Sequence, residues 1–142
     1  MTNDAEEILD QGSALLAPLL HPQGFAFKIL EAGNSSGGRF ASGEFTRGNR
    51  RLELHFRHSL GMVAYHLESR SISHEDYMCS VLGKHFASHY PGFSGDPLDA
   101  FRDLGLDLKE HGADFLEGSD SVLLHRFDDA LAHVKSRPRL PD

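Results

Sequence analysis

The sequence predicts an α+β fold with an N-terminal helix, a four-stranded antiparallel meander sheet and three C-terminal helices packed on one face of that sheet. The main observation is a change of period along the chain. Apolar residues recur at helical spacing before Gly24 and after Ser73, whereas they alternate with polar residues between Gly24 and Glu68. Because helices and strands are segregated in this way, the pattern is typical of α+β domains rather than of alternating βαβ folds.

The chain has 142 residues, which is enough for one domain with a sizeable core, and it contains no internal repeat and no long linker. Its composition, 39% apolar and 25% charged, is that of a soluble globular protein. We therefore expect a single domain over residues 1–142. Residues 137–142, which include two prolines, are expected to form a loose tail.

The first predicted element is an amphipathic helix over residues 4–20, which ends near Pro18 to Pro22. Its first turn carries three acids, and the helix dipole favours acids at that end. Gly12 is expected to weaken the middle of the helix, because glycine costs about 1 kcal/mol relative to alanine inside a helix.

The four predicted strands cover residues 25–31, 39–47, 50–58 and 62–68, and a glycine-rich loop over residues 33–38 separates the first two. Gly48-Asn49 is a two-residue hairpin turn between the second and third strands, and Leu60-Gly61 is the expected turn between the third and fourth. The apolar face of this sheet is predicted to consist of Phe25, Phe27, Ile29, Phe45, Leu52, Leu54, Phe56, Val63, Tyr65 and Leu67.

After Ser73 the pattern is helical, and Ser73 with Asp76 resembles a capping box. That helix is expected to stop at Tyr90-Pro91-Gly92. Asp96 followed by Pro97 is a strong start signal for the next helix, which should run to about residue 116. Apolar spacing over residues 122–134 predicts the last helix.

The formal charge of −7 provides no broad positive field for a nucleic acid, so a nucleic-acid partner is not expected. No apolar stretch approaches the roughly 20 residues that span a bilayer, so a membrane partner is not expected either. Cys79 is the only cysteine, which excludes an intrachain disulfide, and the first ten residues do not resemble a signal peptide. These features favour a cytoplasmic protein.

The polar face of the predicted sheet gathers acids and histidines. With these turns, Glu44 faces Glu53, His55 faces His66, and Glu53 faces Glu68. Carboxylates directly opposite one another repel unless a metal ion or a neighbouring arginine compensates them. The cluster is therefore a candidate metal or acid–base site, while a solvated sheet face and a partner-binding surface are the other interpretations.

A second candidate surface is acidic. Carboxylates recur at helical spacing along the third predicted helix, which suits a basic protein partner, although such a stripe is also typical of a solvated face. Together with two basic residues of the sheet, the predicted partner-binding residues are Asp99, Asp103, Asp107, Glu110, Asp114, Arg51 and Arg57.

Several strings resemble a group of small bacterial proteins of unknown function. They are FASGEF at residues 40–45, RRLELHFRHSLG at 50–61, SHEDYM at 73–78, and YPGF followed by DPLDAF within 90–101. The resemblance covers most of the chain. It implies no activity, cofactor or catalytic residue.

The leading functional prediction is a non-enzymatic protein-binding domain without a cofactor, whose partner is another protein, such as a toxin that it neutralises, or a second copy of itself. The alternative is a metal-dependent or acid–base enzyme that uses Glu44, Glu53, His55, His66 and Glu68. The ten histidines add a third hypothesis, in which self-association changes between about pH 7 and pH 5.5.

Overall fold

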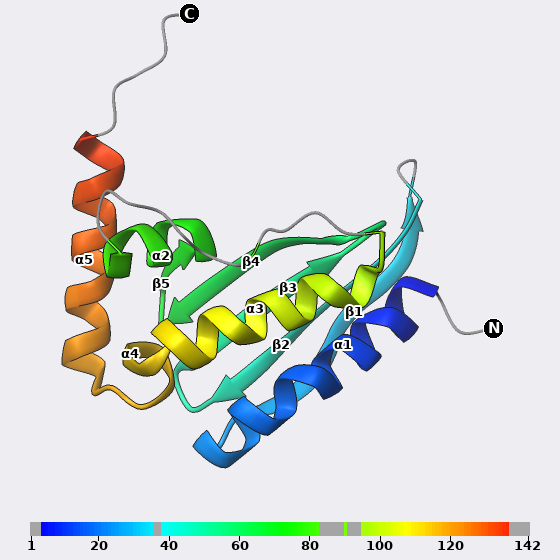
Figure 1. Cartoon of the computed structure of the whole chain (residues 1–142), viewed down its shortest axis with the longest axis horizontal. Helices are drawn as coiled ribbons and strands as arrows, with labels where there is room; N and C mark the ends of the chain where they lie inside the picture. The colour runs from blue at the N-terminus through cyan, green and yellow to red at the C-terminus, as the bar shows by residue number, and fades with distance from the viewer. Residues whose placement is uncertain (1–3, 36–37, 83–89, 91–94, 137–142) are drawn as a thin grey trace, which may run out of the picture.

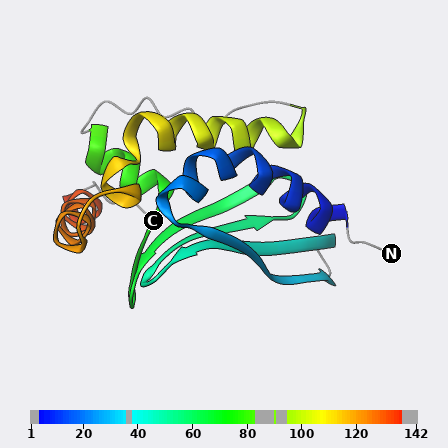
Figure 2. The same ribbon diagram turned by 90° about the horizontal axis from the view of Figure 1, so that it is seen from below.

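A computed structural model describes residues 4–35, 38–82, 90 and 95–136 of the chain, and it shows an antiparallel sheet with helices packed on one face (Figures 1 and 2). The α+β class is confirmed. The sheet has five strands, in the order β1-β2-β3-β4-β5, one more than the sequence predicts. The elements are α1 Asp4–Leu20, a 3-10 turn His21–Gln23, β1 Ala26–Ser35, β2 Gly38–Arg47, β3 Arg50–Phe56, β4 Leu60–Leu67, β5 Arg70–Ser73, α2 His74–Leu82, α3 Pro97–His111, α4 Ala113–Leu116 and α5 Asp120–Ser136.

The additional strand, β5, has only four residues, and it forms a tight hairpin with β4. Glu68 lies in the turn of this hairpin with a φ of 54°, a left-handed conformation that is uncommon outside glycine. Only four residues, Arg70–Ser73, follow this turn before α2 begins, so the strand is too short for an alternation that would predict it.

The register between β2 and β3 is confirmed, because Phe45 pairs with Leu52 and Glu44 pairs with Glu53. The predicted register between β3 and β4 was wrong. Tyr65 pairs with Leu52 rather than with Phe56, a displacement of four residues, and Leu60 already belongs to β4. The turn therefore lies at residues 57–59. Because the displacement is even, every side chain of β4 stays on its predicted face.

The helix starts follow the predicted signals. The side chain of Asp96 accepts a hydrogen bond from the Leu98 backbone N–H at 2.9 Å, and the Ser73 Oγ accepts one from the Asp76 N–H at 3.1 Å. The helix predicted to reach residue 116 is instead interrupted at Gly112, so that α3 and the short α4 are separate. The predicted extension beyond α2, residues 36–37 of the glycine-rich loop and the tail at 137–142 lie outside the described residues.

The core lies between the sheet and the two helices α1 and α3, which lie side by side over one sheet face (Figure 2). Eight of the ten predicted core residues are buried, and Phe27 and Ile29 are half-buried at the edge of the core. Each buried large apolar side chain contributes about 1.5 to 3 kcal/mol, so this layer supplies most of the stability. At the crossing of the helices, Gly12 leaves room for the ring of Phe101.

The other side of β1, β2 and β3 carries no helix in the part of the chain that the structure describes (Figure 2). We call this side the open face. The strand pairing places on it Lys28, Ser42, Glu44, Thr46, Arg51, Glu53, His55, Met62, Ala64 and His66. None of the helices within the described residues is long and apolar enough to cross a membrane.

Candidate functional site

The polar side chains of the open face form a continuous chain of contacts across four strands, which we call the open-face network. It begins at β1, where the Lys28 Nζ lies 3.6 Å from Oε1 of Glu44 on β2. Oε2 of Glu44 accepts a hydrogen bond of 3.1 Å from Nη1 of Arg51 on β3. Nη2 of the same arginine lies 3.3 Å from Nδ1 of His66 on β4.

Glu53 completes the open-face network by binding two histidines. Its Oε1 lies 2.8 Å from Nε2 of His66, and its Oε2 lies 3.2 Å from Nε2 of His55. A guanidinium can only donate, so Nδ1 of His66 accepts from Arg51. With Nδ1 as the acceptor, Nε2 is the ring nitrogen that donates to Glu53. Each ring nitrogen of His66 is occupied by one contact.

Arg51 explains how two carboxylates can face each other at this point of the sheet. Glu44 is only 4% exposed, yet it is bound by Lys28 on one side and Arg51 on the other. Burial raises the pKa of the Glu53 carboxyl, but the hydrogen bonds and charges of His66 and His55 outweigh it, so the pKa lies below its ordinary value. Both carboxylates are thus compensated by side chains of the sheet.

Four of the five residues of the predicted metal or acid–base site therefore lie together. The fifth, Glu68, does not, because the register displacement moves it into the β4–β5 turn, where it contacts Asn49. The predicted row of three facing carboxylates was wrong for this reason. Among the described residues, no group of three or more His, Cys, Asp or Glu side chains is arranged to hold a metal ion.

The predicted acidic stripe of the third helix is divided by the structure. Asp107 is 1% exposed, so its placement on an outer face was wrong. Asp114 belongs to α4 and forms an ion pair of 2.9 Å with Arg126 of α5. Asp99 remains on α3, where it binds Arg102. Of the other acids in the stripe, Glu110 is exposed and Asp103 is half-buried.

Asp107 is the end of a buried hydrogen-bonded chain that sequence reasoning missed. Its Oδ2 lies 2.8 Å from Nε2 of His74, the Nδ1 of His74 lies 2.6 Å from the hydroxyl of Tyr65, and the Tyr90 backbone N–H also donates to Oδ2. One sequence signal was present. Asp107 comes three residues after Leu104 and directly before Leu108, so it shares their inward side of the helix.

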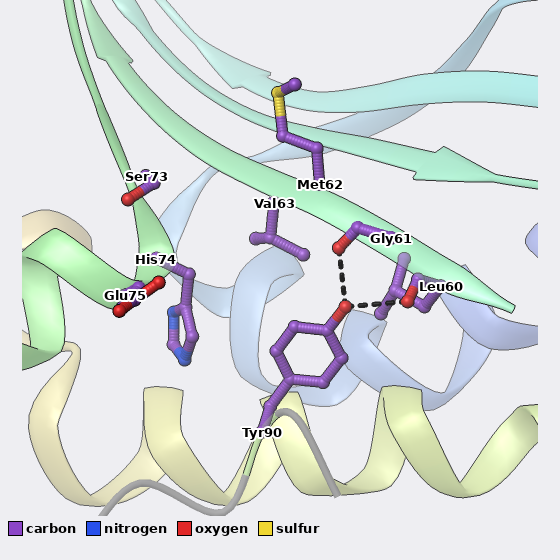
Figure 3. Close-up of a pocket in the computed structure, with 8 residues that line it drawn as sticks. All are labelled: Leu60, Gly61, Met62, Val63, Ser73, His74, Glu75 and Tyr90. Atoms are coloured by element: carbon purple, nitrogen blue, oxygen red, sulfur yellow. Dashed lines mark hydrogen bonds between the residues drawn. The ribbon is translucent and has the colours of Figure 1, made fainter. Parts of the chain in front are cut away.

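This buried chain borders a hollow of about 360 Å³ between β4, the start of α2 and Tyr90 (Figure 3). The Tyr90 hydroxyl donates to the backbone carbonyls of Leu60 and Gly61, while the rings of His74 and Tyr90 pack in a T-shaped arrangement. Both nitrogens of His74 are bonded within the protein, and burial raises the pKa of Tyr90 to about 12 and that of Tyr65 well above its ordinary value. These groups therefore hold elements together and offer no base to a molecule in the hollow.

An apolar groove of about 290 Å³ lies between the β4–β5 hairpin and α5. Met62 of β4, which is 63% exposed, and Leu131 of α5, which is 46% exposed, both line it. We call it the Met62 groove. Ser71 of β5 also lines it and pairs with His66 of the open-face network. The groove and the open-face network are therefore adjacent.

Two arginines beside the Gly48-Asn49 turn hold the fold together. Arg50 is buried and donates to the carbonyls of Phe115 and Gly118 and to the carboxylate of Asp120. Arg47 donates to the carbonyls of Gln23 and Leu116. Both side chains attach the sheet to backbone carbonyls at the ends of helices, where such groups lack intrahelical partners.

Arg57, which the sequence grouped with Arg51 as a partner-binding residue, lies apart from the open-face network. Its guanidinium lies over the Phe40 ring, 5.4 Å from the centroid, at the turn between β3 and β4.

Comparison of the chain with protein-family models, with curated proteins and with solved structures finds no match.

Proposed function

We propose that this protein binds another protein through the Met62 groove and the adjoining open-face network. The observation that carries the proposal is the exposure of Met62 and Leu131 at one groove between the β4–β5 hairpin and α5, beside the part of the sheet that no described helix covers. Large apolar side chains that gather around a groove, with polar groups beside them, are typical of the centre of a protein interface.

The open-face network suits the rim of such an interface. Its carboxylates are already compensated by Lys28, Arg51 and the two histidines, so a partner can cover it without burying an unpaired charge. The metal-dependent or acid–base alternative would require these internal contacts to be exchanged for contacts with a metal or a substrate.

The charge of the chain defines the class of partner. A protein of formal charge −7 attracts a basic protein and repels an acidic one, which raises the rate of association with the former. Asp76 lines the groove, and Asp128 of α5, which forms an ion pair with Arg70, precedes Leu131 in the same helix. A basic toxin that this protein neutralises would be one such partner.

The test compares two pairs of substitutions with the same chemistry. Met62→Glu with Leu131→Glu alters the groove, whereas Leu15→Glu with Leu106→Glu alters two leucines of similar exposure, 39% and 42%, on the helix layer. Each full-length variant is used to retain proteins from native lysate at physiological salt, and the retained protein is then purified and titrated by calorimetry. We expect a basic protein that binds the wild type and the helix-layer variant, and binds the groove variant at least tenfold more weakly.

Equal binding by both variants, or binding of no purified protein by the wild type, would contradict the proposal. Sedimentation of the wild type at about 100 µM is expected to show a monomer. A dimer that the groove substitutions dissociate would instead assign the surface to a second copy of the chain and overturn the proposal of a different, basic partner.

A further inference from the structure

The two methionines that the structure describes differ completely in their access to solvent. Met62 of β4 is 63% exposed, more than any other large apolar side chain among the described residues, whereas Met78 of α2 is 0% exposed and belongs to the core. Figure 3 shows the Met62 side chain extending from β4 on the side away from His74 and Tyr90. A reagent in solution can therefore reach the Met62 side chain without any opening of the fold.

Met62 also occupies a sensitive position on the surface. It lines the Met62 groove, where Ile72 of β5 and Leu131 of α5 are the other large apolar residues, and it lines the hollow beside Tyr90 as well. An unbranched thioether adapts its shape readily to an apolar partner surface. Because a partner in the groove must contact this side chain, a change in its polarity changes the binding surface.

Oxidation of the thioether is a reaction that makes this change. A lone pair of the sulfur attacks one oxygen of hydrogen peroxide, the O–O bond breaks, and the peroxide is reduced to water while the sulfur becomes a sulfoxide. Methionine sulfoxide reductases reverse the reaction. They use two thiols, which become a disulfide, and the sulfoxide oxygen leaves as water. The sulfoxide oxygen is a strong hydrogen-bond acceptor, so covering it with an apolar partner surface is unfavourable.

We propose that Met62 is a site of reversible oxidation by hydrogen peroxide, and that its sulfoxide weakens the binding of the basic partner in the Met62 groove. The second step rests on the proposed protein-binding function. Leu131 and Ile72 are unchanged by peroxide, so oxidation reduces the affinity of the groove and leaves the fold intact. Met78 keeps its thioether under the same conditions because the core excludes the reagent.

The first experiment measures oxidation of the full-length protein in the absence of a partner. The protein is incubated with hydrogen peroxide, and each methionine is followed by peptide mass spectrometry. We expect Met62 to be oxidised about tenfold or more faster than Met78 in the folded protein, and the two rates to converge in urea, which exposes Met78. Similar rates in the folded protein would overturn the proposal, as would failure of a methionine sulfoxide reductase to restore Met62.

The second experiment measures binding of the purified basic partner by calorimetry. Wild type oxidised at Met62 is expected to bind about tenfold more weakly than the untreated protein, and to recover after reduction. Met62→Leu is the matched control, because leucine keeps the position apolar and is not oxidised by peroxide. This variant retains Met78 and Cys79, so it reports any effect of their oxidation. Unchanged binding by the oxidised wild type, or an equal loss in peroxide-treated Met62→Leu, would overturn the proposal.

The two experiments distinguish this proposal from the proposed function. If the untreated protein binds a basic partner and the oxidised protein binds it equally well, the regulation by oxidation is wrong and the protein-binding function stands. If no basic protein binds the untreated chain, the protein-binding function is wrong and the effect on binding falls with it. The oxidation rates, measured without a partner, decide in either case whether Met62 is the modified residue.

Discussion

Nε2 of His74 lies 2.8 Å from Oδ2 of Asp107, in the interior of the protein, where α2 meets α3. The pair is extended by Tyr65 of β4, which shares its hydroxyl with Nδ1 of the same imidazole. Three elements, β4, α2 and α3, are thus connected by polar groups that are almost fully buried. A buried polar group of this kind stabilises the fold only while all of its partners are present.

We expect His74→Ala to lower the free energy of unfolding by about 3 to 5 kcal/mol, because it leaves the buried Asp107 carboxylate without its imidazole. Urea denaturation followed by circular dichroism measures this change. His125→Ala, on the exposed side of α5, is the control and should retain the wild-type midpoint. Similar midpoints for the two variants would show that the buried chain contributes little.

Arg50→Met is expected to cost about 3 kcal/mol or more, since the backbone carbonyls of Phe115 and Gly118 lose a charged donor. The same urea experiment tests this prediction. Arg102→Met removes an exposed arginine instead and should leave the midpoint almost unchanged. A stable Arg50→Met protein would mean that water replaces the guanidinium at these carbonyls.

Gly12→Ala tests the crossing of α1 and α3. Helix propensity alone predicts a gain of about 1 kcal/mol, but a Cβ at this position would overlap the Phe101 ring, and overpacking costs about 1 to 3 kcal/mol. We therefore expect a net loss. Gly105→Ala in α3 is the matched control, because its Cβ would lie 3.5 Å from Leu16 Cδ2, an ordinary contact, and the propensity gain should remain. Thermal unfolding of both variants shows whether each substitution raises or lowers the Tm.

The stability that Glu53 contributes through the open-face network depends on pH. Its pKa is lower in the folded protein than in the unfolded chain, so its contribution to stability is complete above its unfolded pKa of about 4.5 and is lost as the pH falls through the lower folded value. Glu53→Gln should therefore reduce the loss of stability between about pH 5 and pH 3, and Glu7→Gln on α1 is the control for removal of one carboxylate. Urea midpoints across this range measure the effect, and an unchanged difference between pH 5 and pH 3 in Glu53→Gln would contradict it.

The sequence predicts the sheet faces better than the strand partners. Gly48-Asn49 specifies one turn, and the match of Phe45 with Leu52 then determines the register. The next turn lies at residues 57–59, but histidine, serine and glycine within 58–61 allow more than one turn position from the sequence. A displacement of four residues leaves each side chain on the same face of the sheet. Apolar patterning alone therefore cannot distinguish the two registers.

The same reasoning explains what could be predicted of the site. Glu44, Glu53, His55 and His66 were expected on one face because facing depends only on alternation. Which of these side chains form hydrogen bonds with one another depends on which residues lie opposite each other, and hence on the register. Asp107 was assigned to solvent because carboxylates are seldom buried, and its partner His74 is 33 residues away in the sequence.

The Tyr90 hydroxyl has a consequence for the behaviour of the protein at high concentration. β5 pairs only with residues 64–67 of β4, so the first half of β4 lies beyond the end of its neighbour. There the Tyr90 hydroxyl, with its one hydrogen, lies at the carbonyls of Leu60 and Gly61, where the amide of an added strand would otherwise bind. Tyr90 thus occupies acceptors that a second chain would need in order to add a strand at residues 60 and 61 of β4.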